Sequence, residues 1–587
     1  MGLTIAGISA HFHDAACGLM RDGRLVAAAQ EERFSRIKHD PSIPRAAFRY
    51  CLEAAGLTIA DVDAIAYYED PVKKLDRQLW MGLPQVPPAT PASLFRLDPT
   101  RPGREIREIL GFEGPVDYFD HHLSHAASSY YFSGFPEAAI LTVDAVGEWS
   151  TASYGRAEGA RIELFEEVRF PDSLGLLYSA ITSYLGFDVN DAEYKVMGLA
   201  PYGQPRYADK VRRLIEVQGD GQFRLDLRYF DFLGGTRMFS EKLCALFGKP
   251  PRAPESALSP FAKDVARSVQ VVLEEILLAK VAYLHRRVPS ANLCLAGGVA
   301  LNCVAVGRIV REGPFRNVFV QPAASDAGSA LGAAALSHVR RTGQRPEERR
   351  LPHVFLGPAF AADDIARTLS ASAARLQDFR GREEELLHAT VDRLAAGKVI
   401  GWFQGRMEFG PRALGHRSIL ADPRDPGMRE RINAQVKKRE AFRPFAPAVL
   451  AGRASAHFAL DHPAPFMLET CAVRSRLELP AITHVDGSAR VQTVDGEGSP
   501  RFARLLQAFE ARTGCPILLN TSFNLRGEPI VCTPADAVLC FVRSDLDCLV
   551  LEDILLDRDG LPPSWRAAFG STVPYASGVS DSVYALF

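Results

Sequence analysis

The chain has 587 residues, too many for one hydrophobic core, so two or more domains are expected. Apolar residues make up 47% of the chain and charged residues 24%, the balance of an ordinary globular protein. The formal net charge of -2 excludes a global field that would draw the chain to nucleic acid or to an anionic membrane, so any bound anion must be held by a local cluster.

The first residues and the cysteines indicate a reducing compartment. The run MGLTIAGISAHFHDAACGLM lacks a basic start and carries His11, His13 and Asp14 inside its apolar stretch, which argues against a signal peptide. No uninterrupted apolar stretch is long enough to span a bilayer. The ten cysteines form no CxxC pair, which disfavours a thiolate zinc site. We therefore expect a cytoplasmic protein with reduced thiols and no membrane partner.

Residues 1 to about 350 alternate short strands, loops and helices, which predicts α/β architecture. A strand, an acidic loop and a returning strand occur in residues 3–34 and again in residues 139–159, which predicts an internal duplication. Residues 262–287 have apolar residues near the helical period. A segment rich in Arg, Pro and Gly at residues 340–360 predicts a domain boundary.

The first motif is DHHLSHAASSYYFSGF. On a helix, His121 and His125 would leave the same face and could bind one ion, although most HxxxH pairs are incidental. Asp144 ends an apolar strand, and Asp326 lies between a strand and a helix of small residues. At that position Asp326 could instead be the N-cap of the helix. Two His and two Asp would form a mixed nitrogen and oxygen site suited to Fe, Mn or Zn.

The second motif is LCLAGGVALNCVAVGRI. Gly297 and Gly298 follow a buried strand and would let a flat ligand approach the backbone closely, although a tight turn explains them equally. Asn302 is expected one turn into the next helix, where it could bind a ribose or a base.

The third motif consists of the strings EFGPRALGHRSIL and NAQVKKREAFRPFAPAVL. It is dense in cations that are flanked by aromatic residues and prolines, which predicts an anion pocket rather than a solvated face. Downstream, the string LLNTSFNLRGEP places amide and hydroxyl groups at alternating positions, so they share one side of an extended segment. The cations are Arg412, Arg417, Lys437 and Arg443, with His416 among them, and the alternating residues are Asn520, Ser522 and Asn524.

Over nearly its whole length, the chain resembles the O-carbamoyltransferase family of nodulation and antibiotic-tailoring enzymes. Several long strings in the right order make this resemblance more specific than any single motif. The chain departs from the family pattern at Ala145, where Gly is common, and at His416, where Asn is frequent. The strings are HDAACGLM, EERFSRIKHD, HHLSHAAS, VDAVGEWS, YKVMGLAPYG, GGVALN, SDAGSALGAA, EFGPRALGHRSIL, KREAFRPFAP and NTSFNLRGEPIVCTPADA.

The resemblance implies a duplicated actin-like ATPase (ASKHA, threonylcarbamoyl-transferase-like) domain over residues 1–350. A YrdC-like α/β domain is implied over residues 355–560, and residues 561–587 are expected to form a C-terminal tail. The YrdC-like domain would join carbamoyl phosphate and ATP into carbamoyl-adenylate. The actin-like domain would then transfer the carbamoyl group to a hydroxyl of a small-molecule natural product, as in antibiotic biosynthesis.

Residue roles also follow from the resemblance. The two His and two Asp would bind a divalent metal, with ferrous iron implied and Mg²⁺ as a further candidate. Lys437, Arg443 and Arg412 would hold carbamoyl phosphate or the adenylate, with Ser522 and Asn524 nearby. Lys38 would reach the phosphates of ATP in the N-terminal domain.

A general base must take the proton of the acceptor hydroxyl, and His13 and Asp14 are the candidates, His13 being preferred for its pKa. A structural role, as polar groups that cap strand ends, stays an even alternative for both. Three other functions remain open: an actin-like-fold kinase or ATPase, a threonylcarbamoyl-type tRNA modification enzyme and a nucleotide-binding sensor. The net charge gives no support for a tRNA surface, so no nucleic-acid partner is expected. The sequence leaves the oligomeric state and the acceptor open.

Overall fold

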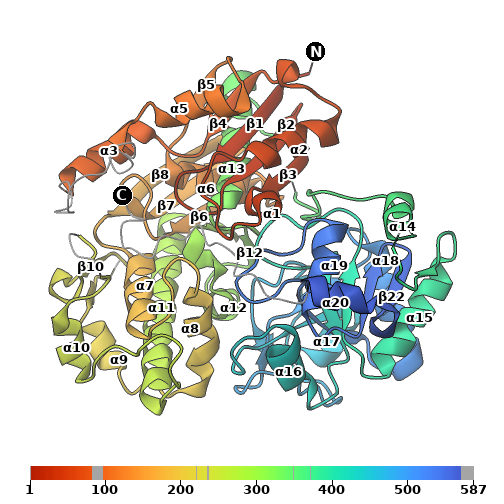
Figure 1. Cartoon of the computed structure of the whole chain (residues 1–587). Helices are drawn as coiled ribbons and strands as arrows, with labels where there is room; N and C mark the ends of the chain where they lie inside the picture. The colour runs from red at the N-terminus through yellow and green to blue at the C-terminus, as the bar shows by residue number, and fades with distance from the viewer. Residues whose placement is uncertain are drawn as a thin grey trace. The chain divides into compact units, whose positions relative to one another are not determined.

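The computed structural model describes residues 2–81, 97–219, 221–233, 237–347, 350–370 and 372–569 (Figure 1). The described residues divide into two compact units. The first contains residues 2–32 and 39–351, and the second contains residues 33–38 and 352–569. The division between Leu351 and Pro352 falls inside the segment rich in Arg, Pro and Gly.

The first unit contains two five-stranded sheets. The order of the first is β3-β2-β1-β4-β5, and the order of the second is β8-β7-β6-β11-β12. The strands of the first sheet are β1 Thr4–Ser9, β2 Ala16–Arg21, β3 Arg24–Gln30, β4 Ala64–Tyr67 and β5 Val116–Tyr118. Those of the second are β6 Glu137–Val143, β7 Ser150–Glu158, β8 Arg161–Arg169, β11 Asn292–Ala296 and β12 Asn317–Val320.

The two sheets have the same topology. In each, three consecutive strands pair antiparallel, and two later strands add in parallel beside the first of the three. The predicted internal duplication is therefore confirmed. Because β1 and β6 hold equivalent central positions, the loops that follow them, which contain His13 and Asp144, are equivalent as well.

Helices connect and cover these strands (Figure 1). The predicted helix at residues 262–287 is present as α11, Pro260–Arg287. A small two-stranded sheet pairs β9, Ile215–Val217, with β10, Phe223–Leu225. The other helices of the first unit include α2 Arg45–Ala55, α3 Pro71–Trp80, α5 Arg101–Glu105, α6 His121–Tyr130, α7 Leu174–Tyr184, α8 Glu193–Leu199, α9 Ala208–Arg212, α10 Glu241–Phe247, α12 Cys303–Glu312 and α13 Asp326–Thr342.

Helix α13 packs against α6 and against strands β1 and β2. Its sequence, DAGSALGAAALSHVRRT, is rich in Ala, Gly and Ser, which lets these backbones approach closely. A Cβ atom at Gly332 would lie 1.9 Å from the backbone oxygen of Ser124 on α6, so no larger residue fits there. The small residues of α13 thus fix its distance from α6. These two helices contribute three of the four predicted metal ligands.

The second unit is built on an eight-stranded mixed sheet of order β13-β22-β21-β14-β15-β20-β16-β19. One hydrophobic core cluster of this unit includes Trp402, Phe403 and Phe541, and another contains Met407, Ile530 and Cys532. The strands are β13 Gln377–Asp378, β14 Ile400–Phe403, β15 Arg417–Ala421, β16 Ala446–Leu450, β19 Gln492–Val494, β20 Ile517–Ser522, β21 Cys548–Leu551 and β22 Ile554–Asp557. The helices are α14 Ala362–Ser370, α15 Glu383–Ala395, α16 Met428–Arg431, α17 Ala454–His457, α18 Pro500–Thr513, α19 Pro534–Arg543 and α20 Pro563–Phe569. A further pair joins β17, Cys471–Ala472, to β18, Ser488–Ala489.

The predicted tail begins as part of the second unit. Leu561 and Trp565 pack against the core of that unit, and Arg543 Nε donates a hydrogen bond to the carbonyl oxygen of Phe569 at 3.0 Å. Residues 570–587 of the predicted tail lie outside the described residues.

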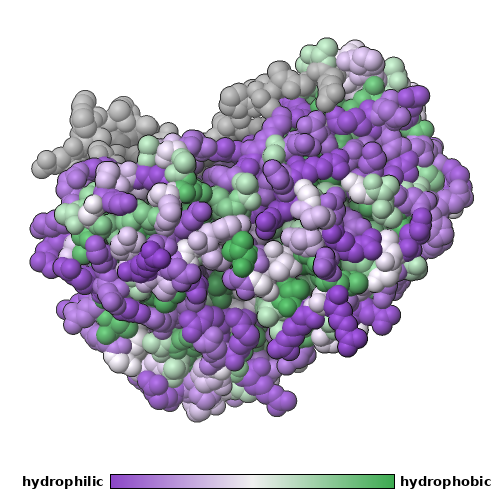
Figure 2. All heavy atoms as spheres, turned by 90° about the horizontal axis from the view of Figure 1, so that it is seen from below, coloured by the Kyte–Doolittle hydropathy of each residue, from purple (hydrophilic) through white to green (hydrophobic). Residues whose placement is uncertain are grey.

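Hydrophilic residues predominate on the face drawn in Figure 2, and hydrophobic residues occur there singly or in small groups. Among the described residues, no helix is long and apolar enough to cross a membrane.

Candidate metal centre and anion site

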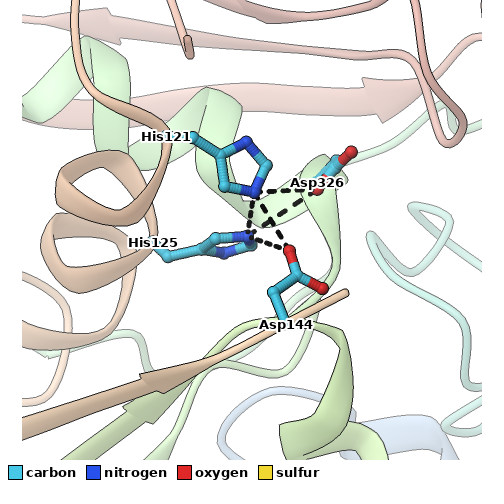
Figure 3. A group of neighbouring side chains, drawn as sticks. All are labelled: His121, His125, Asp144 and Asp326. Carbon is cyan, nitrogen blue, oxygen red and sulfur yellow. Dashed lines mark hydrogen bonds and ion pairs between the residues drawn. The ribbon is translucent and has the colours of Figure 1, made fainter. Parts of the chain in front are cut away.

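Four predicted ligands meet in the first unit (Figure 3). His121 and His125 project from the first turns of α6, and Asp144 follows the last residue of β6. Asp326 is the first residue of α13, and the N-cap position is taken by Ser325. The capping interpretation of Asp326 is therefore wrong, and its carboxylate is available to the cluster.

The ligand atoms of these four residues lie within 4.8 Å of one another. The Nε2 atoms of His121 and His125 are 3.0 Å apart. Asp144 Oδ2 lies 3.0 Å from the first of these nitrogens and 3.1 Å from the second. Asp326 Oδ1 lies 3.7 Å from each. Two nitrogens and two oxygens thus converge on one point.

Outer hydrogen bonds orient these ligands. His125 Nδ1 lies 2.9 Å from Ser329 Oγ, so the second ring nitrogen is held by α13. Asp144 Oδ1 accepts hydrogen bonds from the backbone N–H groups of Ala145 and Gly298, at 2.9 and 3.1 Å. Such contacts fix the rotamer and the tautomer of a ligand, which a metal site requires.

The electrostatics of the cluster fit a cation. Burial lowers the pKa of His121, but the hydrogen bond to Asp144 and the charges of Asp326 and Asp144 outweigh it and raise this pKa to about 9. Despite burial, the two imidazoles hold the pKa of Asp144 well below its usual range. Only one proton can lie between the two facing Nε2 atoms, whereas one divalent ion would satisfy all four ligand atoms at once. The residues present therefore fit a transition metal.

A second cluster lies at the loop between β1 and β2. Asp14 Oδ2 lies 3.2 Å from His13 Nδ1, and Asp14 Oδ1 lies 2.7 Å from His39 Nδ1. His39 Nε2 in turn lies 3.1 Å from Asp191 Oδ1. The structure thus brings the two predicted catalytic residues together and joins them to His39 and Asp191.

Opposing effects act on the pKa values of this cluster. Burial lowers the pKa of His39, but the charge of Asp14 and the hydrogen bonds to Asp14 and Asp191 raise it to about 10. Burial also lowers the pKa of His13, while the charge and hydrogen bond of Asp14 raise it above its ordinary value. Burial would raise the pKa of Asp14, but the imidazoles of His13 and His39 hold it well below its usual range.

Two members of this cluster, His39 and Asp191, were not predicted from the sequence. His39 directly follows the predicted phosphate contact Lys38, in the string EERFSRIKHD, and that adjacency was an available signal. Asp191 lies three residues before the first residue of the matching string YKVMGLAPYG, and only the fold brings it to the loop after β1.

The Gly-rich motif has a different arrangement from the one predicted. Gly297 has φ +91°, and a Cβ atom there would lie 2.2 Å from the carbonyl oxygen of Val143, so the close approach is to β6. Asn302 is the N-cap of α12 and not one turn into it. Its Oδ1 accepts from the N–H of Ala305 at 3.1 Å, and its amide pairs with that of Gln270. The expected position of Asn302 was therefore wrong, and its contact with a nucleotide stays a prediction.

In the second unit, three predicted residues meet at the end of β20. Lys437 Nζ lies 2.7 Å from the carbonyl oxygen of Ser522 and 2.8 Å from that of Asn524. Both side chains also accept hydrogen bonds from Nζ, Ser522 Oγ at 3.2 Å and Asn524 Oδ1 at 2.5 Å. Burial and the charges of Arg439 and Arg443 lower the pKa of Lys437 well below its usual range. An anion would bind this ammonium group by displacing one of the side-chain oxygens, and would favour its charged form.

Arg417 is buried and donates hydrogen bonds to backbone carbonyl oxygens. Its side chain is 0% exposed, and its NH1 and NH2 groups donate to backbone carbonyl oxygens at 2.8–3.1 Å, including those of Gln404 and Pro358. The guanidinium also lies 3.6 Å from the centre of the Phe403 ring. This geometry favours a packing role for Arg417 over the predicted anion contact.

His416 is also a packing residue. Its ring stacks on Phe355 at 3.7 Å, its Nδ1 donates to the carbonyl oxygen of Arg406, and its Nε2 lies 2.9 Å from Ser499 Oγ. Burial lowers the pKa of His416 to about 4, so the ring is neutral at neutral pH.

The remaining predicted residues are Arg412, Arg443, Asn520 and Lys38. Arg412 is half-buried on the loop before β15, and Arg443 lies 3.6 Å from Glu440. Asn520 is buried on β20, two residues before Ser522. Lys38 belongs to the segment Arg33–Lys38, which groups with the second unit. Lys38 was predicted to lie in the first unit, whereas Arg36 of the same segment donates to the carbonyl oxygens of Pro529 and Ile530 in the second unit. The contact of Lys38 with ATP phosphates stays a prediction.

Comparisons with known proteins cover both units. Residues 4–81 and 104–335 match the family model described as Carbamoyltransferase N-terminus, and residues 391–558 match Carbamoyltransferase C-terminus. Nodulation protein NolNO of Sinorhizobium fredii is 40% identical over 96% of this chain and 82% of its own length. The 3'-hydroxymethylcephem-O-carbamoyltransferase of Amycolatopsis lactamdurans is 40% identical over 45% of this chain and 49% of its own length.

Solved structures are more distant. HypF of T. kodakarensis is 14% identical and covers 60% of this chain and 49% of its own, with a TM-score of 0.31.

Proposed function

The chain belongs to the carbamoyltransferase family, and from this premise we propose that it uses ATP and carbamoyl phosphate to carbamoylate a hydroxyl of a small-molecule natural product. The name of the cephem relative supports a hydroxyl acceptor, and the names of the nodulation relatives support a biosynthetic role. We propose that the first unit is the actin-like domain, which its duplicated sheet supports, and that the second is YrdC-like.

The first step is proposed for the second unit. Water releases phosphate from carbamoyl phosphate to give carbamate, and a carbamate oxygen then attacks the α-phosphorus of ATP. The new P–O bond forms carbamoyl-adenylate, and pyrophosphate leaves with the electron pair of the broken P–O bond. Lys437, Arg443 and Arg412 bind the phosphate groups, and their charges stabilise the negative charge that develops on the leaving oxygens. The meeting of Lys437 with Ser522 and Asn524 supports this assignment.

The second step is proposed for the first unit. The acceptor oxygen attacks the carbonyl carbon of carbamoyl-adenylate, the bond to AMP breaks, and AMP leaves with its electron pair. His13 takes the hydroxyl proton, and Asp14, 3.2 Å from His13 Nδ1, stabilises the imidazolium ion that results. The raised pKa of His13 makes it a stronger base, with the charge of Asp14 outweighing burial.

The residues His121, His125, Asp144 and Asp326 would hold a divalent metal in the first unit, and the family resemblance favours ferrous iron. When bound, such an ion acts as a Lewis acid that polarises a carbonyl or phosphoryl oxygen. Gly298 supports this site, since its N–H fixes Asp144 Oδ1.

The observation that carries the proposal is the presence in one chain of two side-chain clusters to which the family resemblance assigns these roles: the His and Asp cluster of the first unit and the Lys437 cluster of the second. The test is to incubate the purified chain with ATP, labelled carbamoyl phosphate and a panel of hydroxyl compounds. Sugars, aminoglycosides, polyketides and peptide products form the panel. We expect ATP-dependent incorporation of label into at least one class, together with release of AMP and pyrophosphate.

A further inference from the structure

Asn520 contains a buried acceptor for which the second unit supplies no donor. Its side chain is 1% exposed. Among the described residues, none donates a hydrogen bond to Asn520 Oδ1. A buried carbonyl oxygen without a donor is costly, so a donor supplied by a ligand or an ordered water would stabilise it.

The orientation of this amide is fixed by its neighbours. Asn520 Nδ2 donates to the backbone oxygen of Ala413 at 3.3 Å and to Gln492 Oε1 at 2.8 Å. Gln492 Nε2 donates to the backbone oxygen of Leu414 at 2.8 Å. Because both backbone partners are acceptors, neither amide can flip without losing its hydrogen bond. Oδ1 is therefore the atom without a donor.

The position of Asn520 links this acceptor to the anion site. Asn520 and Ser522 are two residues apart on β20, so their side chains project from the same face of the sheet. Ser522 Oγ lies 3.2 Å from Lys437 Nζ. The backbone oxygen to which Asn520 donates belongs to Ala413, the neighbour of Arg412. The acceptor thus lies on the strand face and beside the loop that contribute the proposed phosphate ligands.

Carbamoyl phosphate contains the complementary group. Its amino group has two N–H donors next to the carbonyl carbon, whereas an acyl phosphate such as acetyl phosphate has a methyl group of similar size there. We propose that Asn520 Oδ1 accepts an N–H of the carbamoyl group and selects carbamoyl phosphate over acyl phosphates that lack this donor. This assignment rests on the proposed function, and it makes Asn520 a specificity-determining residue of the second unit.

The size of the effect follows from the cost of an unmatched acceptor. With acetyl phosphate, Oδ1 would face a methyl group and stay without a donor, and one such loss corresponds to about a 10- to 100-fold change in rate. We expect the wild-type chain to release pyrophosphate from ATP at least about 10-fold faster with carbamoyl phosphate than with acetyl phosphate, compared as kcat/KM.

The test compares that ratio between variants. Asn520→Ala and the milder Asn520→Ser remove the acceptor, and we expect the ratio to fall about 10-fold or more toward unity. Gln492→Ala is the matched control, because it removes a hydrogen bond of the same amide but keeps Oδ1. Its activity with the two substrates should change in parallel, leaving the ratio as in the wild type.

Three results would overturn the inference. They are a wild type that uses both substrates equally, an unchanged ratio in the Asn520 variants, and an equal fall of the ratio in Gln492→Ala. The first of these needs no variant, so a folding defect cannot hide the answer. A wild type that releases no pyrophosphate with either substrate would instead contradict the proposed function itself.

Discussion

His121 and His125 present their Nε2 atoms to each other at 3.0 Å, with the carboxylate of Asp144 within hydrogen-bonding distance of both. One hydrogen bond can join two ring nitrogens at this distance, whereas one cation would contact both nitrogens and the Asp144 carboxylate at once, so the spacing is compatible with a shared metal ion. The helical spacing i, i+4 produces the pair, and the close packing of α13 adds Asp326.

We predict that the purified chain binds about one transition-metal ion and that His121→Ala or His125→Ala loses it, because each removes one of four ligands. Elemental analysis after gel filtration measures the content. His122→Gln is the control on the same helix, since its Nδ1 contacts Thr142 at 2.7 Å outside the cluster. If the double variant of His121 and His125 retained the metal and the transfer activity, the cluster would not be a metal site.

Lys437→Ala and Arg443→Ala should each slow carbamoyl-dependent exchange of pyrophosphate into ATP at least 10-fold. Each removes a cation from the proposed anion site, where a charge-assisted hydrogen bond contributes about 1.5–3 kcal/mol. Lys438→Ala is the matched control, because the exposed Lys438 side chain donates to the carbonyl oxygen of Arg543 instead. Wild-type exchange in Lys437→Ala would exclude its assigned role.

His13→Ala should retain consumption of ATP and carbamoyl phosphate, while transfer to the acceptor falls about 10²–10⁴-fold, the usual loss on removal of a general base. The wild-type transfer rate should rise with pH above about 6.5, because the pKa of His13 is raised and only the neutral ring accepts a proton. A folding defect would depress both half-reactions together. Normal transfer by the variant would place the base elsewhere.

The bridge from His39 to Asp14 and Asp191 should appear in the pH dependence of stability. The pKa of His39 in the folded chain is about 10, above the unfolded value of about 6.5. This group therefore stabilises the fold fully below pH 6.5, and the contribution is lost as pH rises toward 10. Urea denaturation between pH 6.5 and 9.5 should give a steeper loss of unfolding free energy in the wild type than in His39→Gln. Parallel curves would show that His39 is uncharged.

Periodicity and motif spacing predicted much of the first unit. The duplicated strand and loop pattern corresponds to two sheets of identical order, and the HxxxH spacing correctly placed both imidazoles on one face of α6. These features are local, so a sequence carries them directly.

Contacts between distant segments could not be predicted. Asp14 and His39 are 25 residues apart, and Asp191 lies 152 residues from His39, so only the closed fold brings them together. Arg417 illustrates the opposite case: an Arg-dense string predicts an anion pocket, whereas the structure places this side chain against Phe403 and among backbone carbonyl oxygens, which favours packing. Charge patterns do not report which guanidinium faces solvent.

The central claim is that ATP and carbamoyl phosphate are joined before any acceptor is carbamoylated. The most direct measurement incubates the chain with α-labelled ATP and ¹⁴C-carbamoyl phosphate without acceptor, and separates the enzyme-bound products rapidly. The account predicts one species that carries both labels, formed with release of pyrophosphate by the wild type and by His13→Ala but not by Lys437→Ala. Carbamoylation of an acceptor in the complete absence of ATP, with no doubly labelled species, would contradict it.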